Sequence, residues 1–334
     1  MPRLSVLLPC RDAAGELPEA VASLEAQTFR DFEVVAVDDH STDDTFAILR
    51  AWAERDGRVR VLRSQRPGLV SALSTGLAAA RGELVARMDA DDIADPRRFE
   101  QQVALLDARH DIAACGTRVR YFPEKVVRDG ARRYERWINA LIEPEDHARD
   151  IFVECPIPHP TLVIRRSVLH AVGGYRNLGW PEDYDLVLRL WAAGYRMAKV
   201  PEILLHWREG ATRTSRTNPA YSHAAFRRLK VHVLRRTLLA GRDGALVWGA
   251  GPTGKAFARE LLRQGVRLHA FVDLDPRKVG QSIYDTPVIM PTEVGRFLDA
   301  LILGAVGQPR GRTEIRRTLD AMGLEEMRDY CMVA

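Results

Sequence analysis

Three short polar segments carry the residues best suited to chemistry in this 334-residue sequence. They are Pro9–Asp12, Asp38–Asp43 and Met88–Asp92, and each directly follows an apolar run. In the third segment, a turn can direct one of Asp89 and Asp91 to a ribose hydroxyl and the other to a divalent metal ion. Mn²⁺ or Mg²⁺ suits such a position, because a hard ion of this kind binds one or two carboxylates together with substrate phosphates.

Asp91 and Asp92 also have a structural interpretation. Either carboxylate can cap the helix whose start is marked by Pro96, by accepting a hydrogen bond from a first-turn N–H. Strand-to-helix junctions rich in Asp are common, so the spacing alone leaves capping and metal binding as equal alternatives.

The second polar segment is open to the same kind of choice. Ser41 or Thr42 can be a helix N-cap, with Asp44 completing a capping box. Such a cap leaves Asp38 and Asp39 unexplained, because both precede it at the end of the expected strand. We therefore expect these two carboxylates to accept hydrogen bonds from a base N–H and from a ribose.

The elements that must position these segments are visible in the hydrophobic pattern of residues 1–90. Apolar, β-branched runs that favour strands cover 4–8, 32–37, 59–62 and 84–88, and helical spacing covers 17–24, 46–53 and 69–80 between them. This alternation predicts an α/β fold with a mostly parallel sheet flanked by helices. Ligands bind beyond the carboxyl ends of the strands in such sheets, so the three polar segments are expected to form one carboxylate-rich site.

Beyond residue 117 the pattern is less regular, until Pro181 opens a helix that begins with Glu182-Asp183-Tyr184-Asp185. A polar loop over 208–219 and an Arg-rich helix over 221–239 follow. We expect three parts: a first α/β domain over 1–215, a helical linker over 216–241 and a smaller α/β domain over 242–334.

The smaller domain begins with a strand over 245–248, a glycine turn, a helix and a second strand over 268–272. The turn fits the pattern GxGxxG through Gly249, Gly251 and Gly254, with Lys255 after it and Asp273 after the second strand. This context resembles a Rossmann-type half that binds a dinucleotide or nucleotide. Alternatively, the glycines only permit tight packing of strand against helix. We favour a nucleotide-binding, regulatory or scaffolding module over a second enzyme, because no obvious catalytic set follows.

Composition restricts the partners. The 49 basic and 45 acidic residues give a net charge of +4, and no basic block is interleaved with aromatic residues, so no nucleic-acid partner is expected. The four cysteines are scattered without a CxxC pair, which indicates buried thiols in a reducing compartment. No apolar stretch approaches the ~20 residues that span a bilayer. We expect a cytoplasmic protein, with peripheral association at the inner face of a membrane left open.

Five blocks of the sequence, taken together and in order, resemble the family 2 glycosyltransferases of GT-A fold. The blocks are Ser5–Pro9, Val37–Asp43, Gly68–Gly82, Ala86–Asp92 and Pro181–Leu186. They span roughly residues 3–215. Five blocks in family order are far more specific than a single DxD motif.

The resemblance implies an inverting, metal-dependent enzyme that moves a sugar from a nucleotide sugar, expected to be a UDP-sugar, to a hydroxyl acceptor. It implies Asp183 as the general base and Asp91 as a ligand of Mn²⁺ or Mg²⁺. Nucleotide-sugar binding is assigned to Pro9, Arg11, Asp38, Asp39, Arg66, Asp89, Glu182 and Arg208. The acceptor would be a glycan or glycolipid in surface polysaccharide assembly. As an alternative, Glu182 and Asp183 only place favourable charge at the start of a helix.

One late block departs from the family pattern. Members often carry a His two residues after an Arg, and Gly210 occupies that position here. We expect His206 to reach the metal, and phosphate contacts to come from Arg208, Arg213 or Arg216. Each of these could equally be a solvated loop charge. His159 is expected near the acceptor side, with a structural role equally open.

Three other functions fit parts of the sequence. A nucleotidyltransferase that makes sugar nucleotides also uses an acidic α/β site, but the long Gly-rich and basic loop of such enzymes does not follow the first strand. An NAD-dependent oxidoreductase would need a catalytic domain after Asp273. A non-catalytic nucleotide-sugar sensor is disfavoured by the presence of both Asp91 and Asp183.

Overall fold

The computed structural model describes residues 1–210, 213–297 and 299–334. The chain divides into two compact units. The N-terminal unit contains residues 1–147, 156–178 and 182–217, and the C-terminal unit contains residues 148–155, 179–181 and 218–334. Two short segments that precede residue 182 therefore belong to the C-terminal unit. The domain limits predicted at 215 and 241 stay a prediction.

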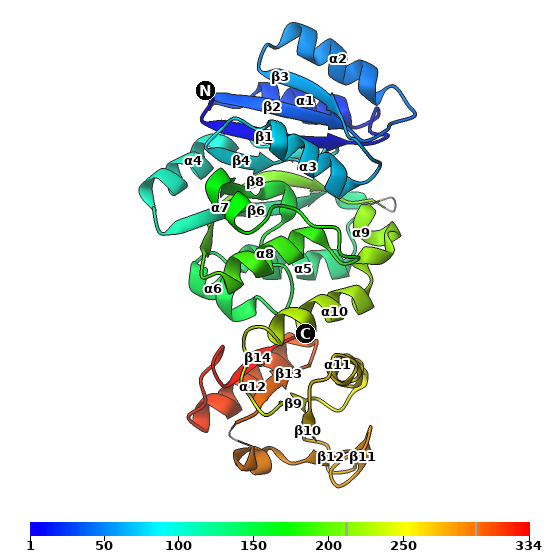
Figure 1. Ribbon diagram of the computed structural model, residues 1–334, viewed down its shortest axis with the longest axis vertical. Coiled ribbons are helices and arrows are strands. Elements are labelled where there is room, and N and C mark those ends of the chain that lie inside the picture. The colour runs from blue at the N-terminus through cyan, green and yellow to red at the C-terminus, as the bar shows by residue number, and fades with distance from the viewer. Residues whose placement is uncertain (211–212, 298) are drawn as a thin grey trace. The chain divides into compact units, whose positions relative to one another are not determined.

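The N-terminal unit is built on an eight-stranded sheet in the order β3-β2-β1-β4-β7-β6-β8-β5. Figure 1 labels β1, β2, β3, β4, β6 and β8 of this sheet. Its first four strands are mutually parallel: β3 (Val59–Arg63), β2 (Phe32–Asp38), β1 (Leu4–Cys10) and β4 (Leu84–Arg87). Every residue of β1, β2 and β4 is buried, as is typical of parallel strands covered on both faces. The predicted α/β class, with a mostly parallel sheet flanked by helices, is confirmed.

The helices between these strands follow from the amphipathic spacing. They are α1 (Leu17–Glu25), α2 (Thr45–Arg55), α3 (Leu69–Ala79) and α4 (Arg98–Ala108). Buried apolar residues recur at intervals of three or four, as in Leu17, Val21 and Leu24 of α1. Trp52 and Phe99 are among the largest fully buried side chains, so this part of the core is well filled. Because these helices pack against the sheet, they hold β1, β2 and β4 in place, and with them the loops that follow each strand.

The other half of the sheet is mixed. β7 (Val163–Arg165) is antiparallel to both β4 and β6 (Ile112–Phe122), and β8 (Arg196–Arg208) is parallel to β6. β5 (Ile93–Ala94) pairs with the end of β8. The remaining helices are α5 (Asp129–Ala140), α6 (Pro144–Asp150), α7 (Arg166–Ala171), α8 (Glu182–Ala192) and α9 (Thr214–Thr217), with 3₁₀ turns η1 (Glu124–Val126) and η2 (His159–Thr161). α8 begins directly after Pro181, as predicted.

The C-terminal unit has a six-stranded sheet of its own, in the order β11-β12-β10-β9-β13-β14. Its strands are β9 (Ala245–Trp248), β10 (Leu268–Val272), β11 (Ser282–Ile283), β12 (Thr286–Ile289), β13 (Leu301–Gly304) and β14 (Tyr330–Met332). Only the β11–β12 pair is antiparallel within the described residues. Helices α10 (His223–Leu234), α11 (Pro252–Arg263) and α12 (Pro309–Ala321) and turns η3 (Pro219–Tyr221) and η4 (Pro291–Arg296) complete it. β9 and β10 have the predicted bounds.

Two expectations from composition concern the whole chain. All four cysteines are buried and free of disulfides, as predicted. Searched over the described residues, no helix combines the length and the apolar character that a membrane span needs.

Candidate active site

The ends of β1, β2 and β4 meet at one edge of the N-terminal sheet, and the three polar segments lie there. Cys10, the last residue of β1, is opposite Asp38, the last residue of β2. On the other side of β1, the Met88 N–H just beyond β4 donates to the Leu7 carbonyl at 3.1 Å. The three segments are therefore neighbours in space, as the predicted strand arrangement requires.

The first two segments are joined to each other by hydrogen bonds. The Asp12 N–H donates to Ser41 Oγ at 3.1 Å, and the Thr42 N–H donates to Asp12 Oδ1 at 2.7 Å. The capping box predicted at Ser41 or Thr42 is wrong, because α2 begins only at Thr45 and its N-cap residue is Asp44. Ser41 and Thr42 instead form hydrogen bonds with Asp12, which follows β1 and precedes Thr42 by 30 residues in the sequence.

Asp38 and Asp39 are both buried and both hold protein groups. Asp38 forms an ion pair with Arg63 at 3.1 Å. Asp39 accepts hydrogen bonds from Ser64 Oγ at 2.9 Å and from the Gly68 N–H at 2.8 Å. Gly68 has a φ of +122°, a conformation that favours glycine, so Asp39 fixes the loop before α3. The predicted contacts of both carboxylates with a base and a ribose stay a prediction.

The other nucleotide-binding candidates of this region lie on or beside the strand ends. Pro9 is buried within β1, whereas Arg11 and Arg66 are exposed. Arg11 Nη1 is 3.9 Å from Asp39 Oδ2. Arg66 is in the loop between β3 and α3, where its N–H donates to Ser71 Oγ at 3.3 Å. The Arg11 side chain therefore lies near Asp39 at the end of β2. Arg66 is held in its loop by the hydrogen bond from its backbone N–H to Ser71.

Asp89, Asp91 and Asp92 form a carboxylate cluster at the third segment. One oxygen of each lies within 4.8 Å of the others, which is a spacing suited to a shared cation. Asp92 is 1% exposed, and its Oδ1 accepts the Arg208 N–H at 2.7 Å. Its Oδ2 is buried and has no hydrogen-bond partner within the described residues. Buried polar atoms are rarely left unpaired, so this oxygen points to a missing ligand.

The capping role considered for Asp91 and Asp92 is wrong. α4 begins at Arg98 with Arg97 at its N-cap position, and β5 (Ile93–Ala94) lies between the acids and the helix. Sequence spacing could not show this, because β5 exists through its pairing with β8, more than a hundred residues later. Asp92 was not among the expected metal ligands, and the same β8 pairing brings it into the cluster.

The electrostatics of the cluster favour a cation. Burial raises the pKa of Asp91 to about 6, and the neighbouring charge of Asp89 adds to this effect. Burial raises the pKa of Asp92 well above its usual range, again with contributions from Asp89 and Asp91. Three acids this close cannot all ionise cheaply, and a hard divalent ion would relieve their repulsion. The donor set therefore fits Mn²⁺ or Mg²⁺.

Arg87, at the end of β4, is a site residue that the sequence reasoning did not single out. It is 2% exposed, its Nη2 is 2.5 Å from Asp89 Oδ1, and its Nη1 donates to the Met88 carbonyl. Burial lowers the pKa of Arg87, but Asp89, Tyr175 and Glu182 around it outweigh that effect and raise the pKa. The group therefore stays cationic. A charged residue inside an apolar strand run was the signal that could have revealed it.

The late block brings Arg208 to the cluster and leaves His206 outside it. Arg208 Nε donates to the Asp91 carbonyl at 2.6 Å, and its guanidinium lies 4.4 Å from the centre of the Phe122 ring. His206 is on β8 opposite Ile93. In the described residues the carboxylate cluster does not include His206, so its role as a metal ligand stays a prediction.

Arg213 and Arg216 also lie near this edge. Arg213 stacks 4.5 Å from the centre of the Trp207 ring, and its charge acts to lower the pKa values of Asp91 and Asp92. Arg216 pairs with Glu209 at 2.5 Å. Arg213 is therefore a cation in electrostatic reach of the acids, which fits the expected phosphate contact.

Glu182 and Asp183 lie in the first turn of α8. Their charge is favourable at the positive end of the helix dipole, so the structural alternative for the pair holds. Glu182 is 4% exposed, and Asp183 is half-buried. Asp183 Oδ1 accepts the Tyr184 N–H at 2.7 Å. This arrangement does not conflict with a catalytic role, and the role of Asp183 as general base stays a prediction.

Tyr175 and His159 line the same region. His159 Nε2 is 3.1 Å from the Tyr175 hydroxyl. Burial lowers the pKa of His159 well below its usual range, with help from the charge of Arg87, so the imidazole is neutral. Burial raises the pKa of Tyr175, and the charges of Arg87, Glu182 and Asp183 all act on it. Neutral hydrogen-bonding groups thus accompany the acids of α8.

In the C-terminal unit, the glycine turn has two kinds of glycine. A Cβ on Gly254 would lie 1.7 Å from the Gly249 carbonyl oxygen, so tight packing accounts for Gly254. Gly249 has a φ of +115°, and a Cβ there would be 3.0 Å from Val306. Gly251 has no such contact within 4 Å. Packing therefore explains two of the three glycines.

Asp273 and Lys255 frame that turn. Asp273 Oδ2 accepts the Ala250 N–H at 2.9 Å and pairs with Lys278 at 2.9 Å. Lys255 is exposed in the first turns of α11. The acid therefore stabilises the turn itself, and nucleotide binding at this place stays a prediction.

Comparison with known proteins identifies the relatives of the chain. Residues 5–173, more than half of the chain, match the family model described as glycosyl transferase family 2. The putative glycosyltransferase EpsE of Bacillus subtilis is 31% identical over 242 residues, which cover 69% of this chain and 84% of EpsE. The amylovoran biosynthesis glycosyltransferase AmsE of Erwinia amylovora is 30% identical over 202 residues, which cover 60% of this chain and 73% of AmsE.

Solved structures share the fold. TarS of S. aureus in complex with UDP-GlcNAc matches with a TM-score of 0.57 and 19% identity, over 70% of this chain and 66% of that one. The mannosyltransferase PcManGT of Pyrobaculum calidifontis, in complex with GDP-Man and Mn²⁺, matches with a TM-score of 0.51 and 22% identity, over 79% and 70%. The chain is a glycosyltransferase and belongs to glycosyl transferase family 2.

Proposed function

We propose that the chain is an inverting glycosyltransferase that moves a sugar from a UDP-sugar to a hydroxyl acceptor with the help of Mn²⁺ or Mg²⁺. One observation carries the proposal: Asp89, Asp91 and Asp92 gather their carboxylates, and Asp92 Oδ2 is buried without a partner in the described chain. A hard divalent ion supplies the charge that this group lacks. The Mn²⁺ and GDP-Man in PcManGT, a protein of the same fold, are consistent with such a site.

In this proposal, some carboxylates of the cluster bind the metal ion and one binds the nucleotide. Asp91 and Asp92 would hold the ion, with His206 as a further predicted ligand, and Asp89 would meet the donor ribose. The ion would offset negative charge on the leaving diphosphate. Arg87 supports the third carboxylate, because its guanidinium contacts Asp89 at 2.5 Å.

Cations next to the cluster are suited to the diphosphate. Arg208 contacts the Asp91 carbonyl, and Arg213 acts electrostatically on Asp91 and Asp92. Arginine presents a planar fork of donors that matches phosphate oxygens. The nucleoside would lie toward Asp38 and Asp39, with Arg11 and Arg66 on the neighbouring loops.

Asp183 would act as the general base. The acceptor hydroxyl attacks the anomeric carbon from the face opposite the diphosphate, and its proton passes to the Asp183 carboxylate. The bond from the anomeric carbon to the acceptor oxygen forms as the bond to the diphosphate oxygen breaks, which inverts the configuration. Tyr175 and the neutral His159 offer hydrogen-bonding groups to the acceptor.

A panel of nucleotide sugars tests the proposal. Release of the nucleoside diphosphate would be followed for the wild type with Mn²⁺, with Mg²⁺ and with EDTA, and for Asp92→Asn under the same conditions. We expect turnover of a UDP-sugar that needs the metal and that falls strongly in Asp92→Asn. Accumulation of a sugar nucleotide from a sugar phosphate and UTP would instead favour a nucleotidyltransferase. Metal-dependent binding with no turnover of any donor would favour the non-catalytic sensor.

The biological role follows from the acceptor class. A glycan or glycolipid acceptor in surface polysaccharide assembly is our proposal, and the amylovoran biosynthesis role in the name of AmsE supports it. Transfer of radiolabelled sugar to a lipid extract of the source cells, compared with a delipidated glycan fraction, would distinguish the two acceptors.

The C-terminal unit is proposed as a second nucleotide-binding module. Gly251 supports this, because no atom beyond its two chain neighbours lies within 4 Å of the position of its absent Cβ, and an approaching ligand would need that space. Calorimetry of the full chain with NAD⁺ and NADP⁺ tests it. Heat that disappears in Gly251→Val but persists in Asp91→Asn would support the module, and no heat with either dinucleotide would favour packing alone.

A further inference from the structure

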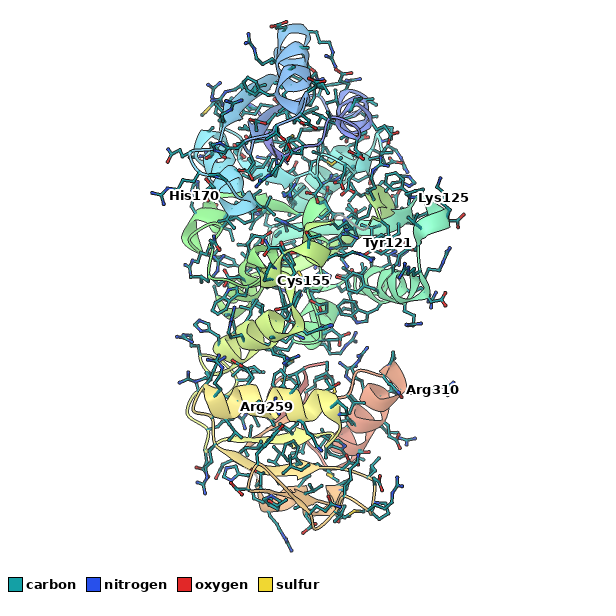
Figure 2. The ribbon with its side chains drawn as sticks, turned by 90° about the vertical axis from the view of Figure 1, so that its right-hand side faces the viewer. Tyr121, Lys125, Cys155, His170, Arg259 and Arg310 are labelled. Carbon is teal, nitrogen blue, oxygen red and sulfur yellow. The ribbon has the colours of Figure 1, made fainter. Side chains whose placement is uncertain are left out.

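The segment from Arg120 to Arg136 concentrates positive charge on the N-terminal unit. It contains six basic residues against three carboxylates, so it accounts for most of the chain's formal net charge of +4. The six residues, which we call the basic surface, are Arg120, Lys125, Arg128, Arg132, Arg133 and Arg136. All six are exposed, and they lie near the end of β6, on η1, at the N-cap of α5 and on α5 itself. Figure 2 shows Lys125 at the outer edge of the unit.

Most cations of the basic surface lack carboxylate partners. Arg132 is 3.9 Å from Glu124, a weak and exposed contact. Within the described residues, no ion pair or side-chain hydrogen bond involves Lys125, Arg128, Arg133 or Arg136. Their charge is therefore available to an external anion.

The side chains that α5 exposes and those that it buries indicate the class of partner. The opposite face of α5 is turned inward, where Tyr134 and Trp137 pack against the core and Ile138 is fully buried. Binding of single-stranded nucleic acid uses exposed aromatic side chains as stacking platforms, and here those side chains are partly buried against the core. The outward face is basic, and it exposes one large apolar residue, Val126. A broad anionic surface fits it better than a strand in a groove.

We propose that the basic surface docks on an anionic phospholipid bilayer. Each exposed Lys or Arg near such a surface contributes about a fivefold gain in binding through the negative potential of the lipid headgroups. Six exposed cations within 17 consecutive residues bring several of them to the headgroups together. Val126 would add a small apolar contact at the interface.

Hydrogen bonds join α5 to β6, the strand that contacts Arg208 of the candidate active site. Asn139 of α5 binds the Val119 N–H at 2.9 Å and the Val119 carbonyl at 2.8 Å, and Glu135 accepts the Tyr121 N–H at 2.6 Å. The next residue of β6, Phe122, carries the stacked Arg208. A bilayer at α5 would therefore lie beside the site. A lipid-borne acceptor fits this placement, and that last step rests on the proposed function.

Vesicle co-sedimentation of the full chain tests the docking. The vesicles contain phosphatidylcholine with about one third phosphatidylglycerol, or phosphatidylcholine alone. The test variant replaces Arg128, Arg133 and Arg136 by Gln, and a second variant replaces the same residues by Lys. The matched control replaces three exposed arginines of the C-terminal unit by Gln: Arg235, Arg310 and Arg317.

We expect the wild type to bind only the anionic vesicles, and to lose binding as salt rises well above ~0.1 M, where the Debye length is already about 10 Å. The Gln variant should bind on the order of a hundredfold more weakly, from about fivefold per lost cation. The Lys variant and the control should bind like the wild type. Equal loss in the control, or undiminished binding of the Gln variant, would overturn the proposal.

Two further readouts separate the possible failures. Donor hydrolysis should be unchanged in all variants, since none of the replaced residues is in the catalytic machinery. Lost hydrolysis in the wild type itself would count against the proposed function and not against docking. If the Gln variant instead loses affinity for a short single-stranded RNA while vesicle binding is absent in the wild type, the partner class we propose is wrong.

Discussion

Arg87→Met should uncover the repulsion within the carboxylate cluster. The guanidinium of Arg87 is 2% exposed and contacts Asp89 at 2.5 Å, and Asp89 lies in turn within 4.8 Å of Asp91 and Asp92. Methionine fills similar space without charge. The substitution therefore removes the buried counter-charge of Asp89, which lies beside the other two carboxylates of the cluster.

The expected destabilisation follows from the burial of the two partners. Breaking a fully buried ion pair costs about 3–5 kcal/mol. The Asp89 side chain is 33% exposed, so solvent screening reduces this to about 2–3 kcal/mol. For a unit of this size, about 2–4 °C is lost per kcal/mol, which gives a fall in melting temperature of roughly 4–12 °C.

A double-mutant cycle in EDTA measures the coupling. Melting would be followed for the wild type, Arg87→Met, Asp89→Asn and the combined variant. Asp89→Asn leaves the buried Arg87 guanidinium without its partner, and Arg87→Met leaves the Asp89 carboxylate without its own. Each single substitution should therefore lower the free energy of unfolding by more than half of the loss caused by removing both partners. The combined variant should be more stable than the sum of single effects predicts, by at least about 1 kcal/mol. Additive effects, or a nearly silent Arg87→Met, would refute the reasoning.

Three further outcomes are expected. Asp183→Asn should leave UDP affinity and melting temperature nearly unchanged while transfer falls by about 10²–10⁴-fold, as for loss of a positioned base; a normal transfer rate would reject the base assignment. His147 is buried, which with the charge of Lys199 lowers its pKa from 6.5 to about 3, so the unfolded chain binds a proton first as pH falls. Stability is therefore lost between pH 6.5 and about 3, by up to about 1.4 kcal/mol per pH unit, and His147→Gln should flatten the denaturation profile in that range; an unchanged slope would exclude the effect. Gly254→Ala should strongly destabilise the C-terminal unit, since its Cβ would meet a carbonyl at 1.7 Å, whereas Gly251→Ala should not; equal melting curves would contradict the packing account.

Strands β1, β2 and β4 could be predicted because they are buried on both faces. A strand such as β1 reads as a continuous apolar run for that reason, and its end could be located from the polar residues that follow. The same rule gave the common edge where Asp38 and Asp89 lie. The helix at Glu182 was predictable from Pro181, whose ring fits the start of a helix.

The details of the site depend on contacts between distant segments, which spacing cannot reveal. Asp92 enters the cluster because β5 pairs with β8 and the Arg208 N–H reaches its carboxylate. Ser41 and Thr42 are diverted from capping by Asp12, which approaches from another strand end. In each case the local sequence was compatible both with helix capping and with another role, and only the contacts with distant segments show which one the fold adopts.

The central claim is that Asp91 joins a divalent ion to the donor diphosphate. Calorimetric titration of UDP with and without Mn²⁺, for the wild type and Asp91→Asn, tests it without knowledge of the acceptor. The burial and repulsion that raise the pKa of Asp91 to about 6 imply that Asn should not destabilise the metal-free fold. We predict that UDP binds the wild type tightly only with Mn²⁺, and that Asp91→Asn loses this metal-dependent binding while its melting temperature holds or rises. Equal UDP affinity in both proteins, with or without Mn²⁺, would contradict the account.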